Sequence, residues 1–126
     1  MKFDFVIGNP PYQETLENTS DKPVYNEFMN AAYETADAVE LITPARFLFN
    51  AGKTSKAWNQ KMLSDEYLKV LLYEPDSGKI FPNTDIKGGV AVTYRDTNKN
   101  VGAIGDFTPY QELNSILHKV KIEKIF

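Results

Sequence analysis

The feature that most constrains this chain is a short apolar run, Phe3 to Ile7, followed at once by Gly8-Asn9-Pro10-Pro11-Tyr12. The run alternates only partly between apolar and polar residues, which is typical of a buried parallel β-strand. The two prolines fix φ at successive positions and remove two backbone N–H donors, so the strand must end in a rigid turn. In open α/β sheets, ligands bind beyond the carboxyl ends of the strands, where this turn is expected to lie.

The turn offers hydrogen-bond acceptors beside an aromatic ring. The side-chain oxygen of Asn9 and the nearby backbone carbonyls can accept, and the ring of Tyr12 follows directly. Such a site suits a planar substrate that carries an amino group, because the ring stacks on Tyr12 while oxygens accept the two amino hydrogens. The alternative is an ordinary structural turn, since Asn and Pro are common turn residues.

The rest of the chain shows helix and strand patterns in turn. We expect a loop over residues 13–21, then a helix that starts near Ser20 or Asp21 with Pro23 in its first turn. Its apolar stripe is expected in the core and comprises Tyr25, Phe28, Met29, Ala32 and Ala36. Further helices are expected over 54–63 and 110–120, and strands over 39–43, 67–73 and 90–95. Residues 45–50 should form a loop or short helix, and residues 74–87 a long loop.

This order of elements predicts an α/β sheet. Strands separated by helices favour parallel neighbours with right-handed crossovers. The last two strands are joined without a helix and can pair antiparallel. A length of 126 residues suits one domain, and we therefore expect residues 1–126 to form a single domain.

The motif Asn9-Pro10-Pro11-Tyr12 after a hydrophobic strand resembles the catalytic motif of S-adenosylmethionine-dependent methyltransferases that act on planar amino or amide nitrogens. The best match is to DNA adenine-N6 methyltransferases of restriction–modification systems. The segments Thr43 to Leu48 and Asp85 to Val90 are similar to runs in methylase domains of the Eco57I type. The alternatives are a protein-glutamine or RNA methyltransferase with the same motif, and a non-catalytic scaffold or specificity partner.

The resemblance implies the second half of a Rossmann-like methyltransferase fold. Residues 3–7, 39–43 and 67–73 would be its fourth, fifth and sixth strands, and residues 89–95 its seventh, inserted antiparallel between the fifth and sixth. The first half should supply a glycine-rich loop for S-adenosylmethionine, but only seven residues precede Gly8, and Gly102 to Gly105 reads as a turn. The cofactor-binding residues are therefore unknown, and we expect a catalytic half-domain that is inactive alone. The open edge of its first strand could pair with a second copy to give a homodimer.

The resemblance also assigns roles to the motif, whose four residues form the expected catalytic set. The Asn9 oxygen and the Pro10 carbonyl would accept hydrogen bonds from adenine N6, so that the nitrogen lone pair points at the methyl group. Asn9 is neutral and would orient N6 rather than act as a base. The target base would be flipped out of double-stranded DNA and stacked on Tyr12. Phe81 would be the second aromatic on the base, with ordinary loop packing as its alternative.

Charge and composition set limits on these expectations. The formal net charge is −3, so most of the grip on DNA phosphates is expected to lie elsewhere. Arg46 and Lys87 are candidates for phosphate contacts, and a solvated charge is the alternative for each. No cysteine is present, no apolar stretch approaches about 20 residues, and a cytoplasmic location is the default. The single histidine, His118, falls on the expected exposed face of a helix, and no metal site is expected.

Overall fold

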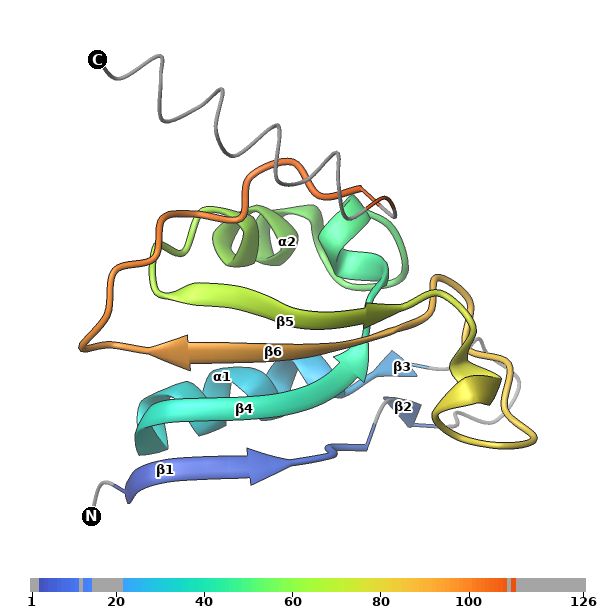
Figure 1. Cartoon of the computed structure of the whole chain (residues 1–126), viewed down its shortest axis with the longest axis horizontal. Coiled ribbons are helices and arrows are strands. Elements are labelled where there is room, and N and C mark those ends of the chain that lie inside the picture. The colour runs from blue at the N-terminus through green and yellow to red at the C-terminus, as the bar shows by residue number, and fades with distance from the viewer. Residues whose placement is uncertain (1–2, 12, 15–21, 109, 111–126) are drawn as a thin grey trace.

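A computed structural model of the chain describes residues 3–11, 13–14, 22–108 and 110 (Figure 1). Within these residues, two α-helices and two short 3₁₀ helices accompany six strands. In chain order the elements are β1 (Phe3–Gly8), β2 (Gln13–Glu14), β3 (Lys22–Pro23), α1 (Tyr25–Thr35), β4 (Ala36–Pro44), η1 (Arg46–Phe49), α2 (Lys56–Leu63), β5 (Leu68–Glu74), η2 (Ser77–Lys79) and β6 (Val90–Asp96). No helix in this described part is long and apolar enough to cross a membrane.

The main sheet has four strands in the order β1-β4-β6-β5. β1 and β4 are parallel, and β6 is antiparallel to both of its neighbours. The structure thus confirms the expected α/β class and the insertion of the last strand between two earlier ones. Gly8 pairs with Leu41, so the carboxyl ends of β1 and β4 lie at the same edge of the sheet, on the right in Figure 1.

Both α-helices pack on one face of this sheet, where the core lies. Rings from α1, η1 and α2 meet there, and Trp58 approaches Tyr25 at 6.0 Å and Phe47 at 5.2 Å between ring centroids. Alternate residues of the strands point into the same core, because successive side chains of a strand point to opposite faces. The strand and helix side chains of the core include Met29, Val39, Leu41, Met62, Leu68 and Ala91.

The opposite face of the sheet carries no helix within the described residues (Figure 1). Phe5 of β1 and Tyr94 of β6 lie on this open face, with their ring centroids 6.4 Å apart. Phe3, Phe5 and Ile7 are 53%, 48% and 67% exposed. Since β4 occupies only one side of β1, the other edge of β1 has no strand partner in the described part of the chain.

The start of α1 differs from the expectation. The helix begins at Tyr25, and Pro23 lies before it in β3, which pairs antiparallel with β2 in a short ribbon. Proline disfavours the helical conformation of the residue before it, so Lys22 stays extended. Pro23 itself pairs with Gln13 of β2, and the helix therefore starts later, at Tyr25. The stripe also differs, because Phe28 is 42% exposed.

Other expected elements differ less or cannot be placed. Ala36 is buried as expected, but it begins β4 rather than ending α1. The second helix starts at Lys56 because the Ser55 hydroxyl caps it and accepts a hydrogen bond from the Trp58 amide at 3.1 Å. The expected helix over 110–120, with His118, lies outside the described residues apart from residue 110, which is not helical.

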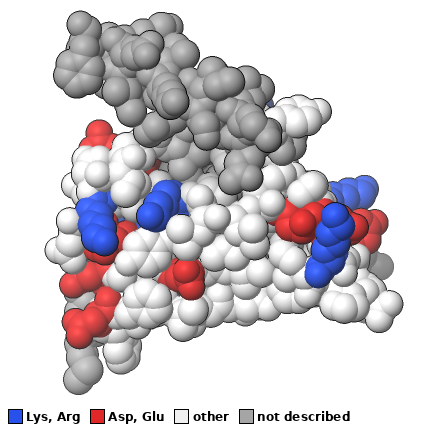
Figure 2. Space-filling model, in the orientation of Figure 1, with Lys and Arg blue, Asp and Glu red and all other residues white. Residues whose placement is uncertain are grey.

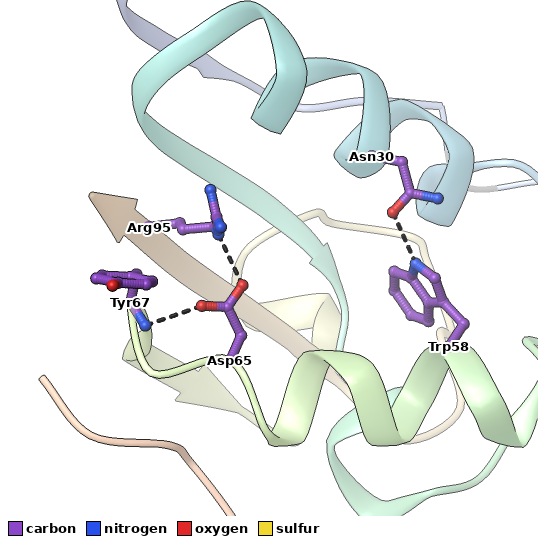
Figure 3. A network of polar contacts seen from close by, with 5 residues as sticks. All are labelled: Asn30, Trp58, Asp65, Tyr67 and Arg95. Carbon is purple, nitrogen blue, oxygen red and sulfur yellow. Dashed lines mark hydrogen bonds and ion pairs between the residues drawn. The ribbon is translucent and has the colours of Figure 1, made fainter. Parts of the chain in front are cut away.

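A polar network ties the end of α2 to the sheet (Figure 3). Asp65 accepts from Arg95 Nε at 2.7 Å through one carboxylate oxygen and from the Tyr67 amide at 2.8 Å through the other. The Arg95 guanidinium also lies 5.0 Å from the centroid of the Tyr33 ring. The network therefore joins α1, the α2–β5 turn and β6.

We expect Asp65→Asn to lower the free energy of unfolding by about 1–3 kcal/mol, because it removes a charged partner from the half-buried Arg95. Urea denaturation of the purified chain measures this change. Asp85→Asn is the matched control, since Asp85 is exposed, and it should change stability by less than about 0.5 kcal/mol. Equal stability of the two variants would contradict the assigned role of Asp65.

Candidate functional site

The turn after β1 has a buried anchor and an exposed functional group. Pro10 is buried, whereas Asn9 and Pro11 on either side of it are exposed. The buried proline ring and its fixed φ hold the backbone against the protein. The Asn9 amide is therefore presented to solvent from a rigid position at the carboxyl edge of the sheet.

A hollow of about 270 Å³ lies at this turn. Two distant parts of the chain line it: Asn9 and Pro10 from the turn, and Phe81, Thr84 and Ile86 from the segment between β5 and β6. The volume falls just below the range of about 300–1,000 Å³ for drug-sized ligands, so it suits a group of the size of one heterocyclic base. The structure thus brings together three of the five predicted site residues. Pro11 is not part of the lining, and Tyr12 lies outside the described residues.

The segment that carries Phe81 is held in shape by Ser77, which is buried. The Ser77 hydroxyl accepts a hydrogen bond from the Ile86 amide at 2.9 Å, and its carbonyl accepts from the Phe81 amide at 2.8 Å. Thr84 adds a further tie, because its hydroxyl donates to the Phe81 carbonyl at 2.6 Å. These bonds link the part of the segment before Phe81 to the part after it, and they fix the backbone at Phe81.

The base of this segment is joined to the end of β4. The Ala45 amide donates to the Gly89 carbonyl at 3.0 Å, and the Tyr73 hydroxyl donates to the Gly88 carbonyl at 3.2 Å. Gly89 has φ +81°, and a Cβ there would lie 2.3 Å from the Glu74 carbonyl oxygen, so the close approach requires glycine. The two segments singled out in the sequence, 43–48 and 85–90, therefore lie in contact.

Thr84, Ile86 and the anchor Ser77 have no assigned role in the sequence analysis. Their contribution depends on how the segment folds back on itself, which no periodic pattern reveals. The one signal in the sequence is the glycine pair before β6, which marks a turn but not its path.

The charges near the site are mixed in sign. Figure 2 shows a mostly uncharged open face, with basic and acidic side chains adjacent to one another where β5 leads into the 75–89 segment. Burial raises the pKa of Tyr73, and the neighbouring Glu74 charge raises it further, so the phenol stays protonated and donates to Gly88. Within the described residues, no group of three or more His, Cys, Asp or Glu side chains is arranged to hold a metal ion.

The sequence model of one protein family, described as Eco57I restriction-modification methylase, matches residues 1–81. The chain belongs to this family. The part that matches the Eco57I methylase family contains the turn at Asn9 and Pro10 and extends to Phe81, the first residue of the second segment that lines the hollow.

A second comparison points the same way. The chain is 32% identical over 95 residues to an uncharacterized adenine-specific methylase of Mycoplasma pneumoniae. The match covers 71% of this Eco57I-family chain and 22% of that relative, so the chain spans about a fifth of the relative's length. No solved structure matches the chain.

We expect Ser77→Ala to loosen the segment that carries Phe81, because the backbone N–H of Ile86 loses its acceptor at a net cost of about 1 kcal/mol. Hydrogen exchange of the Ile86 amide should become roughly fivefold faster, as this free energy implies. Ser64→Ala serves as the control, because Ser64 is an exposed residue at the end of α2. An unchanged Ile86 exchange rate in the Ser77 variant would contradict the anchoring role.

Proposed function

We propose that this chain carries the substrate side of an active site that methylates N6 of adenine in DNA. One observation carries the proposal: Asn9 and Phe81, which lie far apart in the sequence, line the same base-sized hollow. Membership of the Eco57I methylase family and the likeness to a relative named as an adenine-specific methylase support this choice of substrate.

Methylation of adenine N6 requires two hydrogen-bond acceptors at one end of the hollow. The lone pair of adenine N6 is delocalised into the ring, so the nitrogen is a weak nucleophile. Hydrogen bonds from its two N–H groups to the Asn9 side-chain oxygen and the Pro10 carbonyl favour a more pyramidal nitrogen and direct its lone pair. These oxygens belong to a fixed turn and need little reorganisation during the reaction. An amide is not a strong base, so the proton leaves to water.

The base has to leave the DNA helix to reach this hollow. Enzymes that modify a base flip it out of the stack, at a cost that contacts in the pocket offset. We assign one of these contacts to the ring of Phe81, a residue that lines the hollow. We assign the other to Tyr12, which follows the turn directly in the sequence. Stacking on an aromatic side chain contributes about 1–3 kcal/mol per base.

The family implies S-adenosylmethionine as the methyl donor, and its role when bound is to present an electrophilic methyl group. The described residues at this edge do not fit a binding loop for it. The backbone of Gly88 is covered by the Arg46 side chain, and the backbone of Gly89 by Glu74 and Pro75. Neither glycine can approach a cofactor, so our proposal leaves donor binding to other parts of the protein.

We expect Asn9→Ala to reduce turnover about a hundredfold or more, the scale of losing one preorganised polar partner. The measurement is N6-methyldeoxyadenosine formed on unmethylated DNA by the intact protein that carries this chain. Gln60→Ala, on the exposed face of α2, is the control and should retain full turnover. Near-normal turnover of the Asn9 variant would contradict its role. Methylated RNA or protein glutamine, with unmethylated DNA, would overturn the proposed substrate.

We also propose that the free edge of β1 pairs with the β1 edge of a second copy. Its three apolar side chains are about half exposed or more, and an unpaired apolar strand edge is a template for pairing. Two β1 edges related by a twofold axis would satisfy their free backbone groups and bury the ends of these side chains.

We therefore expect the purified chain to dimerise with rising concentration in light scattering, and Ile7→Lys to keep it monomeric. Leu72→Lys is the matched control, since Leu72 is also an apolar residue more than half exposed, and it lies on β5 at the opposite side of the sheet. This control should still dimerise. A wild-type chain that stays monomeric throughout, or loss of the dimer in both variants, would overturn pairing through β1.

A further inference from the structure

The two arginines of this chain have different surroundings, although both are half-buried. Arg95 forms its ion pair with Asp65 and lies against the Tyr33 ring. Arg46 forms no ion pair with any described residue. Its Nε is enclosed by protein, and this N–H has no hydrogen-bond acceptor in the described part of the chain. A buried N–H group without an acceptor costs free energy that no contact within the described residues offsets.

The stem of Arg46 is held by two glycines. A Cβ on Gly52 would lie 3.2 Å from Arg46 Cβ, and one on Gly88 would lie 2.3 Å from Arg46 Cγ. Both glycines have positive φ, +86° and +87°, which other residues rarely adopt. The aliphatic part of the Arg46 side chain therefore packs between the backbone at Gly52 and the backbone at Gly88. This packing limits the rotamers of the side chain and so the positions that the guanidinium can take.

The first of these stretches is itself fixed by a polar network. Asn50 ends η1 with φ +55°, and its side-chain oxygen accepts a hydrogen bond from the side-chain Nδ2 of Asn59 at 3.1 Å. Asn59 is buried and in turn accepts from the Thr54 hydroxyl at 2.6 Å. These bonds fix the residues on both sides of Gly52 and so preserve the enclosure of Arg46.

Tyr25 is a titratable group that lies within reach of the Arg46 charge, but it does not neutralise Arg46. Burial raises the pKa of Tyr25 above its ordinary value, and the hydrogen bond with Thr54 and the charge of Arg46 oppose that rise only in part. Tyr25 is therefore a neutral phenol at physiological pH. No described residue supplies the missing negative charge.

Arg46 does not line the base-sized hollow, but it lies at the same edge of the sheet. Asn9 follows β1 and Arg46 follows β4, and these parallel neighbours end at the same edge of the sheet. Ile86 lines the hollow, and Gly88, two residues further on, contacts the Arg46 stem. Two residues of extended chain span at most about 7 Å, a length that the sugar of a nucleotide bridges.

We propose that Arg46 binds a phosphate of the nucleotide whose adenine enters the hollow. The planar guanidinium presents paired N–H donors that match the oxygens of a phosphodiester. Bound there, a phosphate supplies the anion that the fold omits and sets the position of the sugar, so that N6 arrives at Asn9. The inference rests on the proposed function, because it assumes that the hollow takes adenine.

The test compares 2′-deoxyadenosine with 2′-deoxyadenosine 3′,5′-bisphosphate, which carries both phosphates that flank a nucleotide in DNA. The isotope-labelled chain is titrated with each, and the Asn9 amide and the Arg46 Nε–Hε group are followed by NMR. We expect both ligands to shift the Asn9 signal, only the bisphosphate to shift the Arg46 signal, and the bisphosphate to bind about tenfold tighter, the scale of one charge-assisted hydrogen bond.

Arg46→Met keeps the stem between the glycines but removes the charge, and it should abolish the preference for the bisphosphate. Lys56→Met, at the exposed start of α2, removes a positive charge elsewhere and should leave the preference intact. If the Met variant does not fold, Arg46→Lys replaces it, and loss of the paired donors should reduce the preference at least about threefold.

The outcomes separate the two proposals. If deoxyadenosine shifts Asn9 but the preference survives in the Arg46 variants, the phosphate site is overturned and the proposed function stands. If neither ligand shifts Asn9, the proposed function fails, and inorganic phosphate then decides the Arg46 site. A shift of the Arg46 signal by phosphate would support an anion site there, and no shift would overturn it.

Discussion

The antiparallel ladder formed by β6 is the interaction on which the rest of the structure depends. β6 pairs with β4 from Ala38 to Pro44 on one side and with β5 from Leu68 to Glu74 on the other. Without β6, no backbone hydrogen bonds of the sheet would link β4 to β5, because these two strands are not neighbours in the sheet. The ladder also decides where the segment between β5 and β6 must turn. That turn lies at the carboxyl edge of β1 and β4, and therefore beside Asn9.

The sequence predicts this arrangement well where the signal is local or topological. The apolar run at residues 3–7, the helix over α2 and the three later strands all agree with the structure to within a few residues. The antiparallel last strand follows from the lack of an α-helix between β5 and β6. Because a prolyl turn needs few other residues to define it, the presentation of Asn9 could also be expected from the motif alone.

What the sequence does not predict depends on contacts between distant segments. Ser77 reads as a loop residue, yet it is buried and holds both sides of the segment that carries Phe81. The sequence predicts Gly88 as a turn residue. That a side chain at this position would collide with Arg46 follows only from the structure. The late start of α1 reflects competition between a proline at the first helical turn and the pairing of β3 with β2. Pattern alone does not decide that competition.

The two walls of the hollow differ in how they are attached to the protein. One wall is the turn with Asn9 and Pro10, which follows β1 directly and is held by the buried Pro10. A change in this wall therefore disturbs the sheet itself. The other belongs to a surface segment closed on itself by hydrogen bonds, with an exposed tip from Pro82 to Asp85. Mutation can therefore reshape the second wall while the acceptors on the first stay in place. Under the proposed function, the shape of the hollow can therefore change through one wall, while the Asn9 and Pro10 oxygens on the other wall keep their positions.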